Sequence, residues 1–139
     1  MTDTPTHAVT LTRVSEGVYQ ASNGRGAALT VNGDGNFSAV ELLLAALAGC
    51  TSVDVDVMTG RRAEPEVFEV VASGTKSAEG GNHMTGLQVR FRLRFPEGPD
   101  GDKARARIAP AVKASHDRDC TVSRTIELGT PVTFAIETP

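Results

Sequence analysis

Two cysteines are the residues of this sequence best suited to do chemistry. Cys50 lies in the apolar stretch A-L-A-G-C-T, and Cys120 lies in the polar stretch D-C-T-V-S-R. A cysteine is a nucleophile only as the thiolate, which needs a nearby cation or helix N-terminus to lower its pKa from about 8.5. A free cysteine is more often an inert core residue. Because permanent disulfides are rare in a reducing compartment, the two are better explained together as a transient redox pair.

A zinc site is the alternative use of the same thiols. His116 and Cys120 are about one turn apart on a predicted helix, and could ligate zinc with Cys50 as a third ligand. Without C-x-x-C spacing the zinc signal is weak, and His116 is also explained as a solvated residue near a helix C-terminus. The pattern favours thiol chemistry and leaves a zinc-dependent hydrolase as the weaker alternative.

The helix that carries Cys50 is predicted to run from Ser38 to about Arg61. Ser38 and Glu41 form a capping-box pattern just before an apolar run. From Ala39 to Cys50 only Glu41 is polar, so the first half of the helix has no solvent face and must be surrounded by protein. A membrane span needs roughly 18 consecutive apolar residues, a length this run does not reach. We therefore expect a buried central helix and no membrane.

Strands are predicted on both sides of this helix from period-two alternation and flanking turn residues. The first three form an antiparallel meander, and L-Q-V-R-F-R-L-R-F alternates so strictly that one face should be dry and the other basic. The glycine-rich residues 74–86, which include His83, are predicted to form an exposed hairpin loop. The predicted strands cover residues 8–14, 18–21, 27–31, 67–73, 87–95 and 131–138.

A second helix is predicted over residues 103–119, after a cap at Asp102, with Cys120 at its C-terminal end. A kink or restart is expected at Pro110, because an interior proline costs about 3 kcal/mol. The element order predicts an α+β fold and one domain, residues 1–139. Since the sheet of one chain covers only one side of the central helix, a homodimer is expected.

Charge and composition exclude some classes of function. The net charge is -3 and the basic residues are spread thinly, so nucleic acid is not an expected partner. The N-terminus has neither a basic region nor an apolar region of the kind that directs export, and a cytoplasmic protein is expected.

The stretches V-E-L-L-L-A-A-L-A-G-C-T-S-V-D-V and D-C-T-V-S-R-T-I resemble the two signatures of the OsmC/Ohr family, the osmotically inducible protein C and organic hydroperoxide resistance proteins. The first is closest to the OsmC-like branch. The resemblance implies an OsmC-like fold, with antiparallel sheets wrapped around central helices in an intertwined homodimer. It also implies a cysteine-based peroxidase for organic hydroperoxides, with hydrogen peroxide as a further candidate. Cys50 would be the peroxidatic thiolate, Cys120 the resolving thiol, and an external dithiol such as a lipoyl protein the reductant, with no cofactor.

The resemblance also implies an activating arginine on an early strand or turn, for which Arg13 fits best and Arg25 is the second choice. Glu41 lies about 2.5 turns and about 13 Å from Cys50 along the helix, on its opposite side. It therefore caps the helix or reaches the cysteine of a partner chain. A small-molecule-binding or redox-sensing protein of the same fold is the non-enzymatic alternative.

Overall fold

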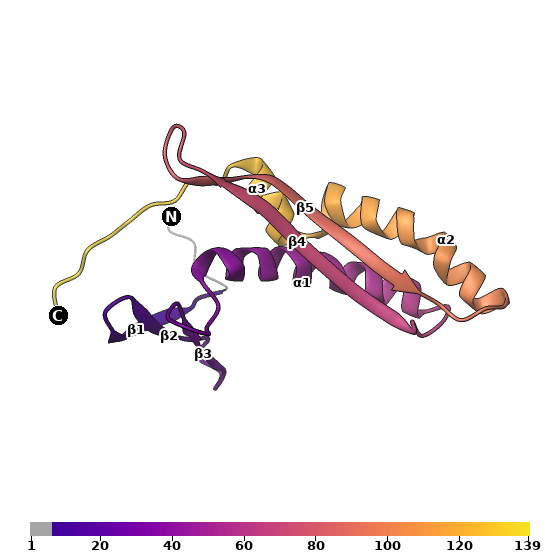
Figure 1. Ribbon diagram of the computed structural model, residues 1–139, viewed down its shortest axis with the longest axis horizontal. Helices are drawn as coiled ribbons and strands as arrows, with labels where there is room; N and C mark the ends of the chain where they lie inside the picture. Colours follow the sequence, from indigo (N-terminus) through magenta and orange to yellow (C-terminus); the bar gives the residue numbers. More distant parts are fainter. Residues whose placement is uncertain (1–6) are drawn as a thin grey trace, which may run out of the picture. The chain divides into compact units, whose positions relative to one another are not determined.

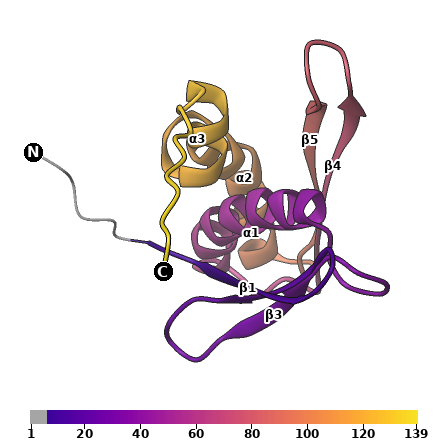
Figure 2. The same ribbon diagram turned by 90° about the vertical axis from the view of Figure 1, so that its left-hand side faces the viewer.

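The computed structural model describes residues 7–139. The chain divides into two compact units, the first ending at Leu43 and the second running from Leu44 to Pro139. The long helix α1 (Ala39–Gly60) begins in the first unit and continues through the second. Figures 1 and 2 show the elements of both units from two directions.

The first unit contains the predicted three-stranded meander. Strands β1 (Thr10–Ser15), β2 (Val18–Ser22) and β3 (Ala28–Val31) form one antiparallel sheet in chain order. Arg13 pairs with Tyr19 across β1 and β2, next to a register shift. The prediction of an antiparallel meander is confirmed.

The capping box at the start of α1 is also confirmed. The backbone N–H of Ser38 donates to Glu41 Oε1 at 2.9 Å, and the N–H of Glu41 donates to Ser38 Oγ at 3.1 Å. Each side chain thus satisfies a backbone N–H that the first turn of the helix leaves without a partner. As a result α1 begins at Ala39, one residue after the predicted start.

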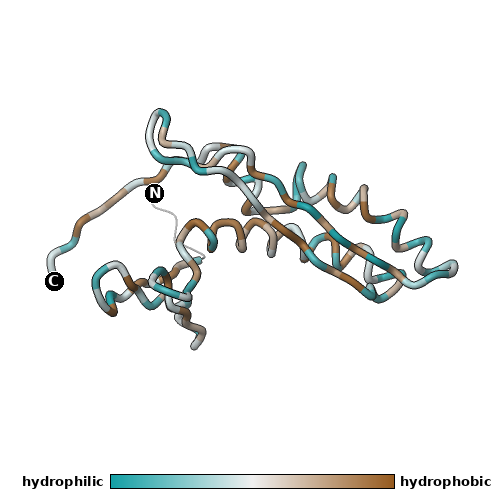
Figure 3. Tube along the Cα trace, viewed as in Figure 1, coloured by the Kyte–Doolittle hydropathy of each residue, from teal (hydrophilic) through white to brown (hydrophobic). Residues whose placement is uncertain are grey.

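The burial of α1 differs from the prediction that its first half is fully enclosed. Its buried side chains form one stripe of residues spaced four apart: Leu47, Thr51, Val55 and Thr59. Other apolar side chains remain exposed: Val40, Leu43, Val53 and Val57. Figure 3 shows how far the apolar character extends along this helix. A single chain therefore buries only one stripe of side chains along α1.

By length and composition α1 could cross a membrane, and 22% of its most apolar window is buried in this chain. Asp54 and Asp56 lie in its second half, however, and carboxylates are costly in a bilayer. The Asp54 carboxylate accepts a hydrogen bond from Ser115 at 2.7 Å. These features are typical of the core helix of a protein rather than of a membrane span.

A long antiparallel hairpin, β4 (Val67–Ser77) and β5 (His83–Arg94), lies beside α1 in the second unit (Figures 1 and 2). The predicted alternation of β5 is confirmed, because its apolar residues are half-buried and its basic residues are exposed. The half-buried residues are Leu87, Val89, Phe91 and Leu93, and the exposed ones are Arg90, Arg92 and Arg94.

The glycine-rich connection was wrongly predicted to be a loop throughout. The two strands continue into it, only residues 78–82 join them, and His83 is the first residue of β5. Gly74 lies at a register shift between Ser73 and Thr75, where a Cβ atom would come within 2.8 Å of Leu87. At this position glycine permits an irregular strand rather than a turn.

The second helix, α2 (Pro99–Ala114), begins earlier than predicted. Pro99 occupies a first helical position, where proline is favourable, and Asp102 lies inside the helix rather than at its cap. The helix continues through Pro110, so the predicted restart there is wrong. Because Pro110 has no N–H, the carbonyl of Ala106, four residues earlier, has no helical donor. Both residues are exposed, so water can donate to that carbonyl instead. The helical geometry instead changes at η1 (Ser115–Asp119), a π-helical turn.

The last part of the chain differs most from the prediction. A third helix, α3 (Thr121–Leu128), was not predicted, and residues 130–139 form no strand. In this segment the apolar side chains are nearly fully exposed: Val132 by 77%, Phe134 by 91% and Ile136 by 97%. A strand requires a neighbouring strand to bond its backbone, and among residues 7–139 the segment has none.

Candidate functional site

Cys120 lies between the π-helical turn and α3, where it caps the N-terminus of α3. Its Sγ accepts a hydrogen bond from the backbone N–H of Ser123 at 3.4 Å, in the place where a hydroxyl or carboxylate oxygen usually caps a helix. The Ser123 hydroxyl donates to the Cys120 carbonyl at 3.3 Å. The Cys120 side chain is fully buried.

Cys50 lies on α1 and is half-buried. Both cysteines are free thiols, and they lie close enough that each shifts the pKa of the other. Next to Cys50, a Cβ atom placed on Gly49 would meet no atom within 4 Å, so the space beside that part of the helix is open. The structure thus brings together the two cysteines that the sequence singled out.

The surroundings of the pair shift the two pKa values in opposite directions. Burial raises the pKa of the Cys50 thiol, and the neighbouring Cys120 raises it further. The backbone N–H groups of Val122 and Thr121 lower this pKa, but their effect is smaller than the combined increase. Burial also disfavours the Cys120 thiolate, but the hydroxyl and N–H of Ser123 and the neighbouring Cys50 outweigh it and lower the pKa of Cys120. In this chain alone, the first negative charge on the pair therefore resides on Cys120.

A chain of hydrogen bonds connects the two segments that carry the cysteines. Thr51, the residue after Cys50, has its Oγ1 2.8 Å from Ser115 Oγ, and Ser115 Oγ is 2.7 Å from Asp54 Oδ2. The Ser115 carbonyl accepts from the N–H of Cys120 at 2.8 Å. Sequence reasoning missed Ser115 and also missed the role of Cys120 as the N-cap of α3.

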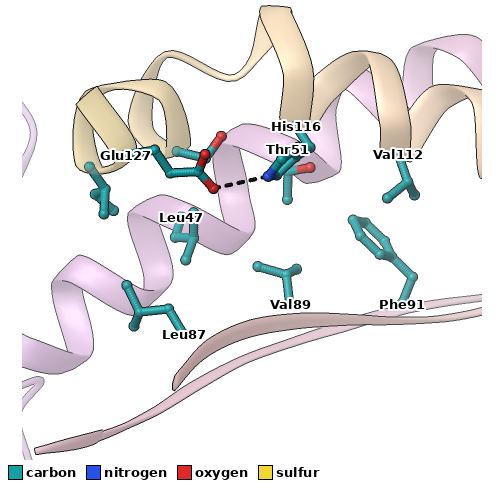
Figure 4. A pocket seen from close by; sticks show the side chains of 10 residues that line it. Leu47, Thr51, Leu87, Val89, Phe91, Val112, His116 and Glu127 are labelled. Carbon is teal, nitrogen blue, oxygen red and sulfur yellow. Dashed lines mark hydrogen bonds and ion pairs between the residues drawn. The ribbon is translucent and has the colours of Figure 1, made fainter. Parts of the chain in front are cut away.

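A cavity of about 340 Å³ lies next to the cysteine-bearing elements (Figure 4). Thr51 and Ser123, which adjoin the two cysteines, lie on its wall. His116 and Glu127 form a polar edge, with His116 Nε2 2.9 Å from Glu127 Oε1. The remaining lining residues are apolar: Leu47, Leu87, Val89, Phe91, Val112 and Ile126.

His116 is engaged by carboxylates on both ring nitrogens. Nδ1 is 2.9 Å from Asp117 Oδ1 and Nε2 is 2.9 Å from Glu127 Oε1, and these two partners raise the pKa of His116. Among residues 7–139, no three or more His, Cys, Asp or Glu side chains are grouped so that they could hold a metal ion. The zinc alternative, with Cys50, Cys120 and His116 as ligands, therefore has no geometric support in this part of the chain.

The other predicted site residues lie in the first unit. Arg13 is exposed on β1, and Arg25 lies in the turn before β3, where its N–H donates to Asn23 Oδ1 at 2.8 Å. Glu41 is held in the capping box, and hydrogen bonds from the backbone and side chain of Ser38 lower its pKa. The capping role of Glu41 is confirmed, while catalytic roles for Arg13, Arg25 and Glu41 remain predictions.

Comparisons with known proteins agree with this architecture. A hypothetical protein from Aquifex aeolicus VF5 has a similar structure, with a TM-score of 0.72 and 21% identity over 91% of each chain. An OsmC-like protein from Mycoplasma pneumoniae has a TM-score of 0.69 and 14% identity over 88% of each chain. A proposed osmotic stress induced and detoxification response protein from Psychrobacter arcticus 273-4 has a TM-score of 0.65 and 13% identity over 90% of this chain and 91% of its own.

At these identities the three structures show a shared fold. No curated protein matches the sequence. The family model for OsmC-like protein matches residues 32–135, which include both cysteines and span the boundary between the two units. The chain therefore belongs to the OsmC-like protein family.

Proposed function

We propose that this protein is a thiol-dependent peroxidase that reduces organic hydroperoxides with Cys50 and Cys120. The observation that carries the proposal is the proximity of two free thiols, one half-buried on α1 and one buried at the N-terminus of α3, each of which shifts the pKa of the other. A half-exposed sulfur can meet a substrate, and a capped buried sulfur beside it can complete a disulfide.

The chemistry takes place in three balanced steps. The Cys50 thiolate attacks the O–O bond of the hydroperoxide, so that sulfenic acid forms on Cys50 and the departing alkoxide takes a proton to become an alcohol. The Cys120 thiolate then attacks the sulfenic sulfur, which forms the disulfide and releases hydroxide. An external dithiol, such as that of a lipoyl protein, reduces the disulfide by two exchange steps and is itself oxidised.

The first step requires that Cys50 carry the negative charge, whereas the chain alone favours charge on Cys120. A cation near Cys50 would reverse this order. We assign that role to Arg13, with Arg25 as the alternative, held by a carboxylate such as Glu41 and supplied by a partner chain.

The partner is a second copy of this chain. Support comes from the apolar residues of α1 that this chain leaves exposed, including Val53 and Val57, and from the open space at Gly49. The exposed alternation of Val132, Phe134 and Ile136 is the pattern of a strand that lacks a sheet. A homodimer would cover both surfaces, and its two reduced cysteine pairs suit a cytoplasmic location.

The cavity beside Thr51 and Ser123 favours an apolar hydroperoxide. Its volume, about 340 Å³, is in the range of small-molecule sites, and its lining is mostly aliphatic and aromatic. The same observation supports the second candidate function, a protein that binds an apolar ligand or senses redox state without turnover.

Dithiol-dependent consumption of cumene hydroperoxide separates the two functions. The peroxidase proposal expects turnover in the wild type, none in Cys50→Ser, and none beyond a single event in Cys120→Ser. A protein that binds cumene hydroperoxide or its alcohol but shows no turnover with any dithiol would be a binding protein instead.

A further inference from the structure

Ser115 links the two cysteine-bearing segments. It is fully buried at the first residue of the π-helical turn, and it is hydrogen-bonded to Thr51, Asp54 and Cys120 in addition to the bonds of its own N–H within α2. We propose that Ser115 is a positioning residue, which holds Cys50 and Cys120 at the separation that a disulfide requires. The inference rests on the proposed redox pair and adds a residue to it.

The directions of the side-chain bonds follow from their chemistry. An ionised carboxylate can only accept, so the Ser115 hydroxyl donates to Asp54 at 2.7 Å. With its one proton used, Ser115 Oγ accepts from the Thr51 hydroxyl at 2.8 Å. The single hydroxyl of Ser115 is thereby fixed to two residues of α1, one next to Cys50 and one a turn further on.

The backbone of Ser115 holds the other cysteine. Its carbonyl accepts from the N–H of Cys120 at 2.8 Å, which is the bond that closes the wide π-helical turn. In a regular α-helical turn the Ser115 carbonyl would accept from the N–H of Asp119 instead of Cys120, and the position of Cys120 would differ. Single π-helical turns of this kind frequently occur at functional sites.

Disulfide geometry explains why such a link matters. The two sulfurs must reach about 2.05 Å with a restricted dihedral angle, and this is possible only if the backbones are held at a narrow separation. If the bonds of Ser115 are lost, α1 and the start of α3 can move apart, and the effective concentration of one thiol near the other falls.

The test measures that effective concentration by equilibrating the full-length protein with reduced and oxidised dithiothreitol, then quenching and counting Cys50–Cys120 disulfides by mass spectrometry. Ser115→Ala should lower the equilibrium ratio of disulfide to dithiol, at a given ratio of oxidised to reduced dithiothreitol, by about tenfold, since bonds to charged groups are among the stronger ones. Thermal unfolding is measured in parallel. Thr59→Val is the matched control, because Thr59 is equally buried on α1 but its hydroxyl donates within its own helix, to the Val55 carbonyl at 2.8 Å.

A second pair of variants decides the question if Ser115→Ala does not fold. Thr51→Val removes the hydroxyl that donates to Ser115, while Thr51→Ser keeps it. The positioning role expects Thr51→Val to lower the disulfide fraction and Thr51→Ser to leave it within about twofold of wild type. Equal values for the two Thr51 variants, or a Ser115→Ala value equal to that of Thr59→Val, would overturn it.

This measurement needs no peroxide. A wild type that forms the disulfide with dithiothreitol but consumes no hydroperoxide removes the proposed peroxidase and leaves the role of Ser115 standing. If the wild type and Ser115→Ala turn over hydroperoxide at the same rate and form the disulfide to the same extent, the proposed role of Ser115 is wrong, and the proposed peroxidase function is unaffected.

Discussion

Cys50 lies close enough to Cys120, where the N-terminus of α3 approaches α1, that each thiol shifts the pKa of the other. Neither cysteine is notable by itself, since one lies inside an apolar helix and the other is fully buried. Their proximity gives them a shared chemistry, because ionisation of one sulfur changes the pKa of the other. The two thiols therefore titrate as a pair.

The identity of the activating cation can be tested through this pair. If Arg13 acts on Cys50, the pKa of Cys50 should lie below that of Cys120 in the wild type. In Arg13→Ala it should rise above that of Cys120, since burial raises the pKa of Cys50 and the hydrogen bonds from Ser123 lower that of Cys120. Alkylation of each cysteine against pH, read by mass spectrometry, gives both values. A shift in Arg25→Ala instead would transfer the role to Arg25, and a Cys50 that is unreactive up to about pH 9 would mean that it is not activated.

Two substitutions at Glu41 separate its capping role from a catalytic one. Glutamine can still accept the hydrogen bond from the Ser38 N–H, so Glu41→Gln should keep the stability of the wild type, whereas Glu41→Ala should lower it. Ser38→Ala removes the other half of the box and should cost about 1 kcal/mol. Urea unfolding of the three variants measures these effects. If Glu41→Gln is as stable as wild type but loses peroxide turnover, the charge of Glu41 has a catalytic role as well.

Much of the fold could be predicted because the local signals were strong. The capping box at Ser38 and Glu41 located the start of α1, and the strict alternation of residues 87–94 identified β5 and its two faces. One of the errors occurred where glycine has more than one structural use. Gly74 permits a strand irregularity, although the glycines around it indicated a loop.

The contact between the cysteines could not be derived from local signals. Cys50 and Cys120 meet because η1 widens the end of α2 and α3 follows at once, and neither a π-helical turn nor a short helix has a strong sequence pattern. The segment from 131 to 138 has the pattern of a strand, but it pairs with no strand in the part of the chain that the structure describes. Its structure depends on what it pairs with, which the pattern alone does not specify.

The open space at Gly49 predicts opposite effects in a monomer and a dimer. In an isolated chain, Gly49→Ala should stabilise α1 by about 1 kcal/mol, because a Cβ there meets no atom. If a partner helix approaches at Gly49, the added methyl should instead weaken dimerisation, and Gly49→Leu should weaken it more. Sedimentation at low micromolar concentration measures the assembly. Gly60→Ala, at the far end of the same helix, is the control and should leave the assembly unchanged.

The stability of the segment around Cys120 should depend on the protonation of His116. Hydrogen bonds to Asp117 and Glu127 raise the pKa of His116 in the folded state above its usual 6.5. The stabilisation is therefore fully present below that value and is lost as the pH rises through the folded pKa. Urea unfolding from pH 6 to pH 9 should show a decline in the free energy of unfolding for the wild type. The decline should be smaller in His116→Gln, and an equal decline in both would contradict the assignment.

The central claim is that Cys50 and Cys120 form one redox pair that reduces a hydroperoxide. Its most direct test is to mix the reduced protein with one equivalent of cumene hydroperoxide, quench with acid and map the cysteine-containing peptides. The account predicts loss of both thiols together, a Cys50–Cys120 disulfide, and sulfenic acid trapped on Cys50 in Cys120→Ser. Two thiols that remain free after the peroxide is added, or a sulfenic acid that forms on Cys120 while Cys50 stays reduced, would contradict it.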